Sequence, residues 1–292
     1  MTQTSVDFSQ KIVLGTAQFG MDYGIANVSG KPSKSEVFEI LEMAWRHGIR
    51  SFDTAPGYES ESLLGEFIAV HGLEKDAILL TKLPGMEETE DKQSAIRANI
   101  EASLEKLGCS IEVLFFHNPQ DSVLLLKDPS FFKKLLEEYP LKNLGVSVYD
   151  PPEVELLKDC KLELAFQFPF NVLDRRFEKV NMPHGRRYAR SIFLQGLLAS
   201  AKGLRSNAPK EQKHTHNLYH RALKKHGLKP VDAAVSFVVY SDCVDYFLMG
   251  VETEKQLQDV LITSLDQRPS ITYFETLLSS IDETLIDPRK WN

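Results

Sequence analysis

Three side chains with acid–base chemistry stand at the ends of three successive apolar runs. Asp53 and Lys82 each end one run and His117 follows the third, while Tyr58 stands just beyond Asp53, after the turn at 55–57. An unpaired carboxylate inside a protein is costly, so we expect Asp53 to meet a cation. Lys82 is the cation that the next run offers. The spacing therefore indicates a cluster of Asp, Lys, His and Tyr at matching strand ends.

Such a set of side chains suits one task, which is giving a proton to an oxygen that becomes an alkoxide. A free phenol has a pKa near ~10 and is a poor acid at neutral pH. A lysine ammonium beside Tyr58 favours the phenolate and lowers its pKa, and Asp53 keeps that lysine charged. His117 can orient the substrate oxygen. No Ser or Cys stands next to a base in a nucleophile motif, which argues against covalent catalysis.

Each of these residues, taken singly, also has a structural interpretation. Asp53 and Lys82 are typical of a structural ion pair, and Tyr58 is typical of an aromatic residue in a turn. His117 before Asn-Pro is typical of a hydrogen-bonding loop residue. Their joint placement on three neighbouring strands favours the catalytic interpretation.

The elements that position these residues alternate along the chain. Short apolar runs predict strands at residues 12–14, 49–53, 78–82, 113–116, 143–147, 164–167, 190–193 and 246–249. Apolar residues at three-four spacing predict helices at residues 33–48, 63–72, 96–108, 131–139, 152–159, 210–226, 230–240 and 253–263.

Strict alternation of strand and helix predicts parallel strands with crossover helices, and eight units in 292 residues favour a closed (β/α)8 TIM barrel, an α/β fold. An open doubly wound sheet is disfavoured because no Gly-x-Gly-x-x-Gly follows any strand. We expect residues 1–292 to form a single barrel domain, with a C-terminal tail of about 270–292 packing on the barrel. The carboxyl ends of all strands share one face of such a barrel, so the four residues would converge there.

Composition limits the partners and the compartment. The formal net charge of −7 and the pI of about 5.7 argue against nucleic-acid binding and against anionic membranes. The longest apolar stretches are too short to span a bilayer, and the first residues do not resemble a signal peptide. Three widely separated cysteines predict reduced thiols in a cytoplasmic protein. No sequence pattern indicates an oligomeric state.

Several motifs, in the same order along the chain, resemble those of the aldo-keto reductases from about residue 11 to about residue 262. They are Gly15-Thr16-Ala17-Gln18-Phe19-Gly20, Phe52-Asp53-Thr54-Ala55-x-x-Tyr58, Thr81-Lys82, His117, Gly145-Val146-Ser147 and Gln167-x-x-x-Asn171-x-x-x-Arg175. The resemblance implies a barrel in which hydride passes from NADPH to a carbonyl carbon. It also implies that Tyr58 is the proton donor, that Lys82 and Asp53 tune it, and that His117 orients the substrate.

The same resemblance implies a cofactor site at the barrel mouth. Its residues are Gly15, Thr16 and Ala17 near the nicotinamide ribose, together with Asp53; Ser147 and Gln167 at the carboxamide; Arg190 in the place of a stacking ring; Ser191, Phe193 and Gly196 in a pyrophosphate loop; and Gly250, Thr253, Gln256 and Leu257 around the adenosine.

The chain departs from the family pattern in this site. Val148 stands where the family commonly has Asn, and Gln256 stands where it usually has the Arg that clamps the 2′-phosphate. Glu252 would repel that phosphate, and Lys255 is the one residue nearby that could compensate. On family grounds NADPH is the expected cofactor, with NADH as the alternative.

Two further patterns allow other interpretations. His214, His216 and His220 have the spacing of ligands on a helix, but no carboxylate or Cys completes the set, so a solvated helix is favoured and no metal site is expected. The basic stretch 174–190 suggests the hypothesis that part of it meets a phosphate of the cofactor or of the substrate, and replacing Arg186 and Arg187 would test this.

The sequence thus predicts an NAD(P)H-dependent carbonyl reductase. Its expected partner is a small aldehyde or ketone, with a sugar or a phosphorylated or nucleotide-linked carbonyl among the candidates. One alternative is a barrel that binds the cofactor but serves as a regulatory partner subunit. Another is an isomerase or lyase in which Lys82 forms a Schiff base.

Overall fold

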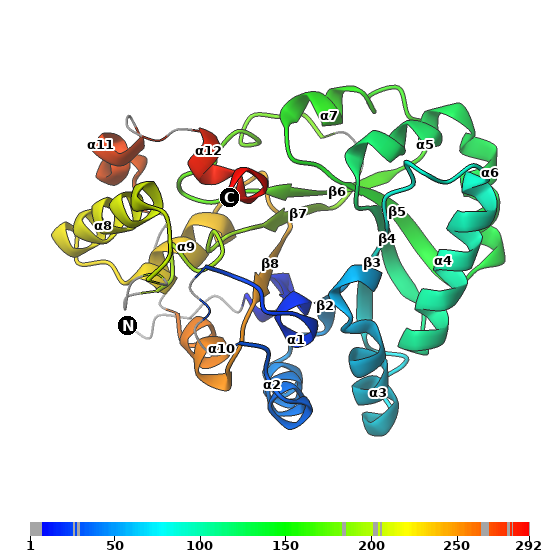
Figure 1. Ribbon diagram of the computed structural model, residues 1–292, viewed down its shortest axis with the longest axis horizontal. Coiled ribbons are helices and arrows are strands. Elements are labelled where there is room, and N and C mark those ends of the chain that lie inside the picture. The colour runs from blue at the N-terminus through cyan, green and yellow to red at the C-terminus, as the bar shows by residue number, and fades with distance from the viewer. Residues whose placement is uncertain are drawn as a thin grey trace, which may run out of the picture.

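Eight parallel strands close into a barrel in the order of the sequence, and the helices lie outside them (Figure 1). The computed structural model describes residues 8–25, 27, 30–182, 185–200, 204, 206–263, 269–278, 281 and 283–291. The strands are β1 (Ile12–Gly15), β2 (Ser51–Asp53), β3 (Ile78–Leu83), β4 (Ile111–Phe116), β5 (Leu141–Ser147), β6 (Leu164–Pro169), β7 (Arg187–Arg190) and β8 (Tyr246–Gly250). The predicted (β/α)8 barrel is confirmed.

Helices connect these strands. The α-helices are α1 (Ala17–Gly20), α2 (Lys34–Arg46), α3 (Glu61–His71), α4 (Lys92–Leu107), α5 (Val123–Lys127), α6 (Pro129–Glu138), α7 (Pro151–Glu155), α8 (Lys210–Lys225), α9 (Pro230–Val239), α10 (Glu254–Leu261), α11 (Glu275–Leu278) and α12 (Glu283–Ile286). Short 3-10 helices are η1 (Ser9–Lys11), η2 (Pro56–Tyr58), η3 (Pro119–Ser122), η4 (Ile271–Phe274) and η5 (Pro288–Lys290).

The interior of the barrel explains why polar side chains reach its mouth. A separate buried cluster consists of Val13, Leu80, Val113, Phe115, Ala165, Tyr188 and Leu248, one or two from each contributing strand. Alternate residues of a strand face the same side. Lys82 follows Leu80 by two residues, His117 follows Phe115, and Gln167 follows Ala165. The side chains that point into the barrel are therefore apolar in its interior and polar at its mouth.

Gly145 of β5 makes room for this packing. A Cβ at Gly145 would lie 2.6 Å from the ring of Phe115 and 2.8 Å from the carbonyl oxygen of Ala165. Phe115 in turn meets Tyr188 edge-on, with ring centroids 5.7 Å apart. A side chain at residue 145 would push Phe115 out of the barrel, and the layer beneath the mouth would have to rearrange.

Helix α2 shows how the outer layer is specified. Ser33 caps its first turn: the Ser33 hydroxyl accepts from the Glu36 backbone N–H, and the Glu36 carboxylate accepts from the Ser33 N–H at 2.8 Å. Such a capping box stabilises a helix by about 1 kcal/mol. The buried face, which includes Ile40 and Leu41, has the predicted three-four spacing.

The seventh strand lies earlier than predicted. The apolar pair Ile192-Phe193 suggested a strand at 190–193, but β7 is Arg187–Arg190. The β7 backbone pairs with β6 on one side and with β8 on the other, so the strand forms without an apolar run. Residues 191–193 instead begin the loop that follows it. The helix predicted at 152–159 is also shorter and ends at Glu155.

The C-terminal segment contacts two parts of the barrel. Phe274 of η4 stacks on Tyr219 of α8, with ring centroids 5.6 Å apart. The guanidinium of Arg289, in η5, lies 3.7 Å from the centre of the Tyr149 ring. Among the described residues, no helix combines the length and apolar character that crossing a membrane requires.

Candidate active site

Asp53 and Lys82 meet at the floor of a pocket in the barrel mouth. Lys82 Nζ donates to Asp53 Oδ1 at 2.5 Å and to the carbonyl oxygen of Thr54 at 2.9 Å. Gln167 Nε2 donates to the other carboxylate oxygen, Asp53 Oδ2, at 2.9 Å. Both charged side chains are almost completely buried, so each needs the other to stay ionised. The ion pair predicted from the two strand ends is present.

Tyr58 lies beside this ion pair, at the end of η2. Lys82 Nζ is 4.8 Å from the centre of the Tyr58 ring, and the His117 ring meets Tyr58 edge-on with centroids 6.1 Å apart. The next residue, Glu59, has a left-handed φ of 59° and turns the chain towards α3. A Cβ at Gly20 would lie 1.6 Å from the Tyr58 carbonyl oxygen. Only glycine therefore lets α1 approach the loop that carries Tyr58 this closely.

Burial and charge act on the pKa of Tyr58 in opposite directions. Burial raises the pKa and the Lys82 ammonium lowers it, and the net shift is upward. We expected the pKa to be lowered. Desolvation of the phenolate outweighs the attraction of the ammonium, so Tyr58 keeps its proton at neutral pH.

The other two titratable groups have defined charges at neutral pH. Burial lowers the pKa of Lys82, but Asp53 and Tyr58 raise it more, so the amine stays protonated. Burial, Lys82 and Arg190 together lower the pKa of His117 to about 4. The imidazole is therefore neutral at pH 7 and can donate or accept a hydrogen bond there.

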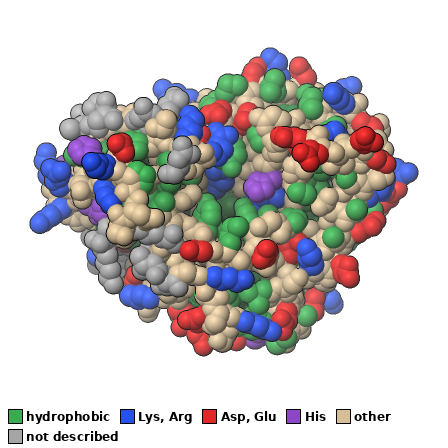
Figure 2. Space-filling model, in the orientation of Figure 1, with side chains coloured by type: hydrophobic (Ala, Val, Ile, Leu, Met, Phe, Trp, Pro, Cys, Tyr) green, Lys and Arg blue, Asp and Glu red, His purple; other side chains and the backbone are tan. Residues whose placement is uncertain are grey.

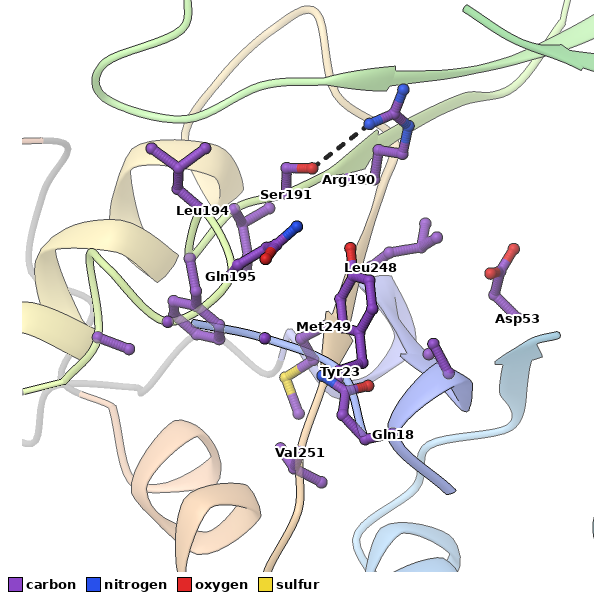
Figure 3. A pocket seen from close by; sticks show the side chains of 18 of the residues that line it. Gln18, Tyr23, Asp53, Arg190, Ser191, Leu194, Gln195, Leu248, Met249 and Val251 are labelled. Atoms are coloured by element: carbon purple, nitrogen blue, oxygen red, sulfur yellow. Dashed lines mark hydrogen bonds between the residues drawn. The ribbon is translucent and has the colours of Figure 1, made fainter. Parts of the chain in front are cut away.

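The pocket above these residues has a volume of about 340 Å3. The face in Figure 2 is hollowed near its centre, where a histidine and basic side chains come together. In Figure 3 the Tyr23 ring lies near the middle of the pocket, with Asp53 on one side and Gln195 on the other. Tyr58 and His117 line the pocket, and Lys82 lies behind its wall.

Most of the predicted cofactor residues line this pocket. They are Gly15, Ala17, Asp53, Ser147, Gln167, Arg190, Ser191, Phe193, Gly196, Gly250 and Gln256. Three others support the wall from behind. The Thr16 hydroxyl contacts the Asp53 carbonyl oxygen and Ser60 Oγ, Thr253 caps α10, and Leu257 is buried in the core.

Sequence reasoning missed several lining residues. They are Gln18, Tyr23, Tyr149, Leu194 and Gln195 among others. A signal existed for Tyr149, because it follows Ser147 by two residues and continues the inward row. No local signal places Tyr23, which reaches the pocket from the loop after α1.

The loop after β7 has an unusual backbone. Ser191, Leu194 and Gln195 have φ values of 58°, 46° and 52°, in the left-handed region. Each costs about 1 kcal/mol or more for a residue with a side chain. Asn171 Nδ2 donates to the Ser191 carbonyl oxygen at 2.9 Å and helps to hold this shape. Strain of this kind concentrates at ligand sites, and this loop lines the pocket.

Arg190, at the end of β7, brings a positive charge into the pocket. Its guanidinium lies 4.0 Å from the centre of the Tyr149 ring, and Arg289 lies over the same ring. Arg190 donates to the Val148 carbonyl oxygen at 3.1 Å and, more weakly, to Ser191 Oγ at 3.4 Å (Figure 3). No carboxylate pairs with it among the described residues. Arg190 therefore keeps its charge available for a ligand.

Arg186 and Arg187 do not take part in the pocket. Arg186 pairs with Glu112 at 2.6 Å, and Arg187 pairs with Asp245 at 2.7 Å. Both lie at the start of β7, whereas the pocket is at the carboxyl ends of the strands. Of the basic stretch 174–190, Arg190 lines the pocket and Arg186 and Arg187 do not, because they lie at the other end of β7.

The histidines of α8 are not a solvated set. His216 is buried, and its Nε2 contacts the Ser200 carbonyl oxygen at 2.7 Å. His220 stacks on it, with ring centroids 4.1 Å apart. The expectation of a solvated helix is wrong for His216, which ties α8 to the end of the loop after β7. Within the described part of the chain, no group of His, Cys, Asp or Glu could hold a metal ion.

Comparison with known proteins agrees with the resemblance read from the motifs. The family model described as "Aldo/keto reductase family" matches residues 11–267. Aldo-keto reductase YhdN of Bacillus subtilis (strain 168) is 23% identical, over 96% of this chain and 94% of its own. D-threo-aldose 1-dehydrogenase of Pseudomonas sp. is 26% identical, over 83% of this chain and 88% of its own.

A solved structure supports the fold. The glycerol dehydrogenase AKR11B4 from Gluconobacter oxydans superposes with a TM-score of 0.67 and covers 94% of each chain. The two sequences are 22% identical, so this likeness speaks to the barrel alone.

Proposed function

Because the chain belongs to the aldo/keto reductase family, whose members are NAD(P)H-dependent carbonyl oxidoreductases, we propose that Tyr58 gives the proton to the carbonyl oxygen of its substrate. The chain is an oxidoreductase that uses a nicotinamide cofactor. We take Lys82 and Asp53 to tune Tyr58 and His117 to orient the substrate. The observation that supports this assignment best is the position of the Tyr58 ring beside both Lys82 and His117.

The pocket offers polar groups that suit a nicotinamide. Among the described residues, the hydroxyl of Ser147 and the ring nitrogens of His117 make no hydrogen bond, and both residues line the pocket beside Tyr58. Buried polar groups without partners are costly, which is the pattern of a site that a ligand completes. We assign the carboxamide to Ser147 and the stacking contact to Arg190. When bound, the nicotinamide supplies hydride to the carbonyl carbon.

Lys82 can stabilise the tyrosinate that proton transfer leaves behind. Its ammonium has three N–H donors, of which Asp53 and Thr54 occupy two. The third is available to Tyr58. As the substrate oxygen gains electron density it takes the phenol proton, and the negative charge passes to Tyr58, next to the ammonium. His117 is neutral, so it steers the oxygen without competing as an acid.

The two alternative functions fit the site less well. A Schiff base on Lys82 would require the amine to reach the substrate, yet the side chain is 1% exposed and does not line the pocket. A purely regulatory barrel would have no need for the convergence of Tyr58, Lys82, Asp53 and His117. We therefore favour carbonyl reduction, or oxidation of the alcohol in reverse.

The substrate is proposed to be an aldehyde or a ketone. One similar protein carries the name D-threo-aldose 1-dehydrogenase, which supports a sugar derivative. A phosphorylated or nucleotide-linked carbonyl now has less support, since Arg186 and Arg187 lie away from the pocket and Arg190 alone remains to meet an anion.

Replacing Tyr58 by Phe tests the assignment. The proton donor is lost while the ring stays, so kcat should fall by about 10^2- to 10^4-fold. Cofactor affinity, measured by quenching of protein fluorescence, should change little. Tyr139→Phe is the matched control, because this phenol donates to Glu101 outside the pocket. If Tyr58→Phe kept more than about a tenth of the wild-type kcat, the proton would have to come from another group.

A further inference from the structure

Arg190 brings a positive charge to the wall of the pocket that no described carboxylate balances. Within the described part of the chain, its guanidinium donates to two neutral acceptors, the Val148 carbonyl oxygen at 3.1 Å and Ser191 Oγ at 3.4 Å (Figure 3). Lys82 differs in this respect, because Asp53 pairs with it at 2.5 Å. The charge of Arg190 is therefore the one that a ligand in the pocket meets uncompensated.

The Tyr149 ring fixes Arg190 in this position. The Arg190 guanidinium lies 4.0 Å from the centre of the ring, and the Arg289 guanidinium lies 3.7 Å from the same centre. Two groups of this size would overlap on one face, so they lie on opposite faces of the ring. Arg289 is itself held by Asp287 at 2.7 Å and by Asp150 at 3.3 Å. The C-terminal segment thus fixes the ring on which Arg190 rests.

The charge of Arg190 reaches the groups that we assign to catalysis. Burial, Lys82 and Arg190 together lower the pKa of His117 to about 4. Burial raises the pKa of Tyr58, and Arg190 is one of the two cations that oppose this rise. Arg190, Tyr58 and His117 all line the same pocket. A ring bound beside Tyr58 therefore lies within the electrostatic field of Arg190.

The two redox forms of a nicotinamide cofactor differ in charge at the ring. The oxidised ring carries one positive charge, and the reduced ring, which carries the hydride, is neutral. A cation on the pocket wall repels the oxidised ring and has no such effect on the reduced ring. The rest of the dinucleotide, including any 2′-phosphate, is the same in both forms. The ratio of their affinities therefore reports on the nicotinamide end alone.

We propose that Arg190 makes this chain bind the reduced nicotinamide cofactor more tightly than the oxidised cofactor. The inference rests on the proposed function, since it assumes that the nicotinamide binds beside Tyr58. An aromatic ring in place of Arg190 would have the opposite preference, because its face attracts a cation. The oxidised cofactor that carbonyl reduction leaves behind is then the form that the pocket holds less tightly.

The test measures equilibrium binding of NADH and NAD⁺ to the full chain by isothermal titration calorimetry, without substrate, with NADPH and NADP⁺ as a second pair. The wild type should bind the reduced form roughly tenfold more tightly, because repulsion between unit charges a few ångström apart near a protein surface is large enough for that factor. Arg190→Gln removes the charge and keeps an N–H donor, so the two affinities should become nearly equal.

Two further variants separate the charge in the pocket from other effects. Arg190→Lys keeps the charge and should keep most of the preference for the reduced form. Arg187→Gln is the matched control, because it removes the same charge from the other end of β7, at a residue that does not line the pocket. The ratio of the two affinities should stay unchanged in Arg187→Gln.

Three results would overturn the proposal. Equal affinity of the wild type for the two redox forms, or tighter binding of the oxidised form, contradicts the preference itself and needs no variant. An unchanged ratio in Arg190→Gln shows that another group sets the preference, and an equal change in Arg187→Gln reduces the effect to net charge. Binding of no nicotinamide nucleotide would contradict the proposed function as well, whereas equal binding of both forms leaves the role of Tyr58 intact.

Discussion

The two ends of the pocket differ in how deeply their charged side chains are buried and in how they are held. At the catalytic end, Asp53 and Lys82 are buried and share hydrogen bonds with Thr54 and Gln167, so each group is held by several others. At the other end, between β8 and α10, where we propose that the adenosine lies (the adenosine end), Glu252 and Gln256 exchange hydrogen bonds at an exposed helix start. The catalytic end follows the family pattern and the adenosine end departs from it.

The difference shows where such a barrel can change without losing its chemistry. A buried ion pair cannot lose one member without leaving the other charge unpaired in a low dielectric. An exposed loop exchanges side chains at little cost in stability. We therefore expect substitutions at the catalytic end to affect both folding and turnover, and substitutions at the adenosine end to affect cofactor binding.

The largest effect should follow from removing Lys82. Lys82→Met leaves Asp53 charged and unpaired, so the free energy of unfolding should fall by about 3 kcal/mol and turnover should be lost. Asp53→Asn added to Lys82→Met removes the stranded charge. Denaturant unfolding of the double variant should show recovered stability while kcat stays near zero. If turnover recovered together with stability, the role of Lys82 would be structural only.

A pH series should separate the two directions of the reaction. Burial raises the pKa of Tyr58, so the phenol is protonated at neutral pH. Reduction needs the phenol and should be flat with pH between the pKa of His117, about 4, and the raised pKa of Tyr58. Oxidation needs the phenolate and should accelerate as the pH rises through the same range. An oxidation rate that falls with rising pH would remove Tyr58 from the proton transfer.

The smallest effect should follow from the helix cap at the adenosine end. The Thr253 hydroxyl accepts from the Gln256 N–H at 3.3 Å, and loss of such a cap costs about 1 kcal/mol. Thr253→Ala should loosen the start of α10 and weaken binding of NADH by a few-fold, with kcat unchanged. Thr253→Ser retains the hydroxyl and serves as the control. A fall in kcat would mean that the two ends of the pocket are coupled rather than separate.

Much of the catalytic end could be predicted from the sequence, because the positions of its side chains follow from the strands that carry them. The period of two along β3 and β4 places Lys82 and His117 on the inner row, and parallel strands bring their carboxyl ends together. The strand at residues 187–190 could not be predicted in this way. Its sequence, Arg-Tyr-Ala-Arg, has no apolar run that would indicate a strand. The strand forms because its backbone pairs with β6 and β8.

The amino-acid sequence by itself determined the alternation of strand and helix, and with it the barrel and the meeting of Asp53 with Lys82. Only the tertiary structure decided that Gln167 joins Asp53, that Tyr149 lies under Arg190, and that Arg186 faces away. The physical reason is barrel closure, which brings together side chains that are far apart in the sequence, such as Gln167 and Asp53, separated by 114 positions. Local sequence patterns do not predict such contacts, because hydrogen bonds and ion pairs across the barrel form only when all the strands are in place.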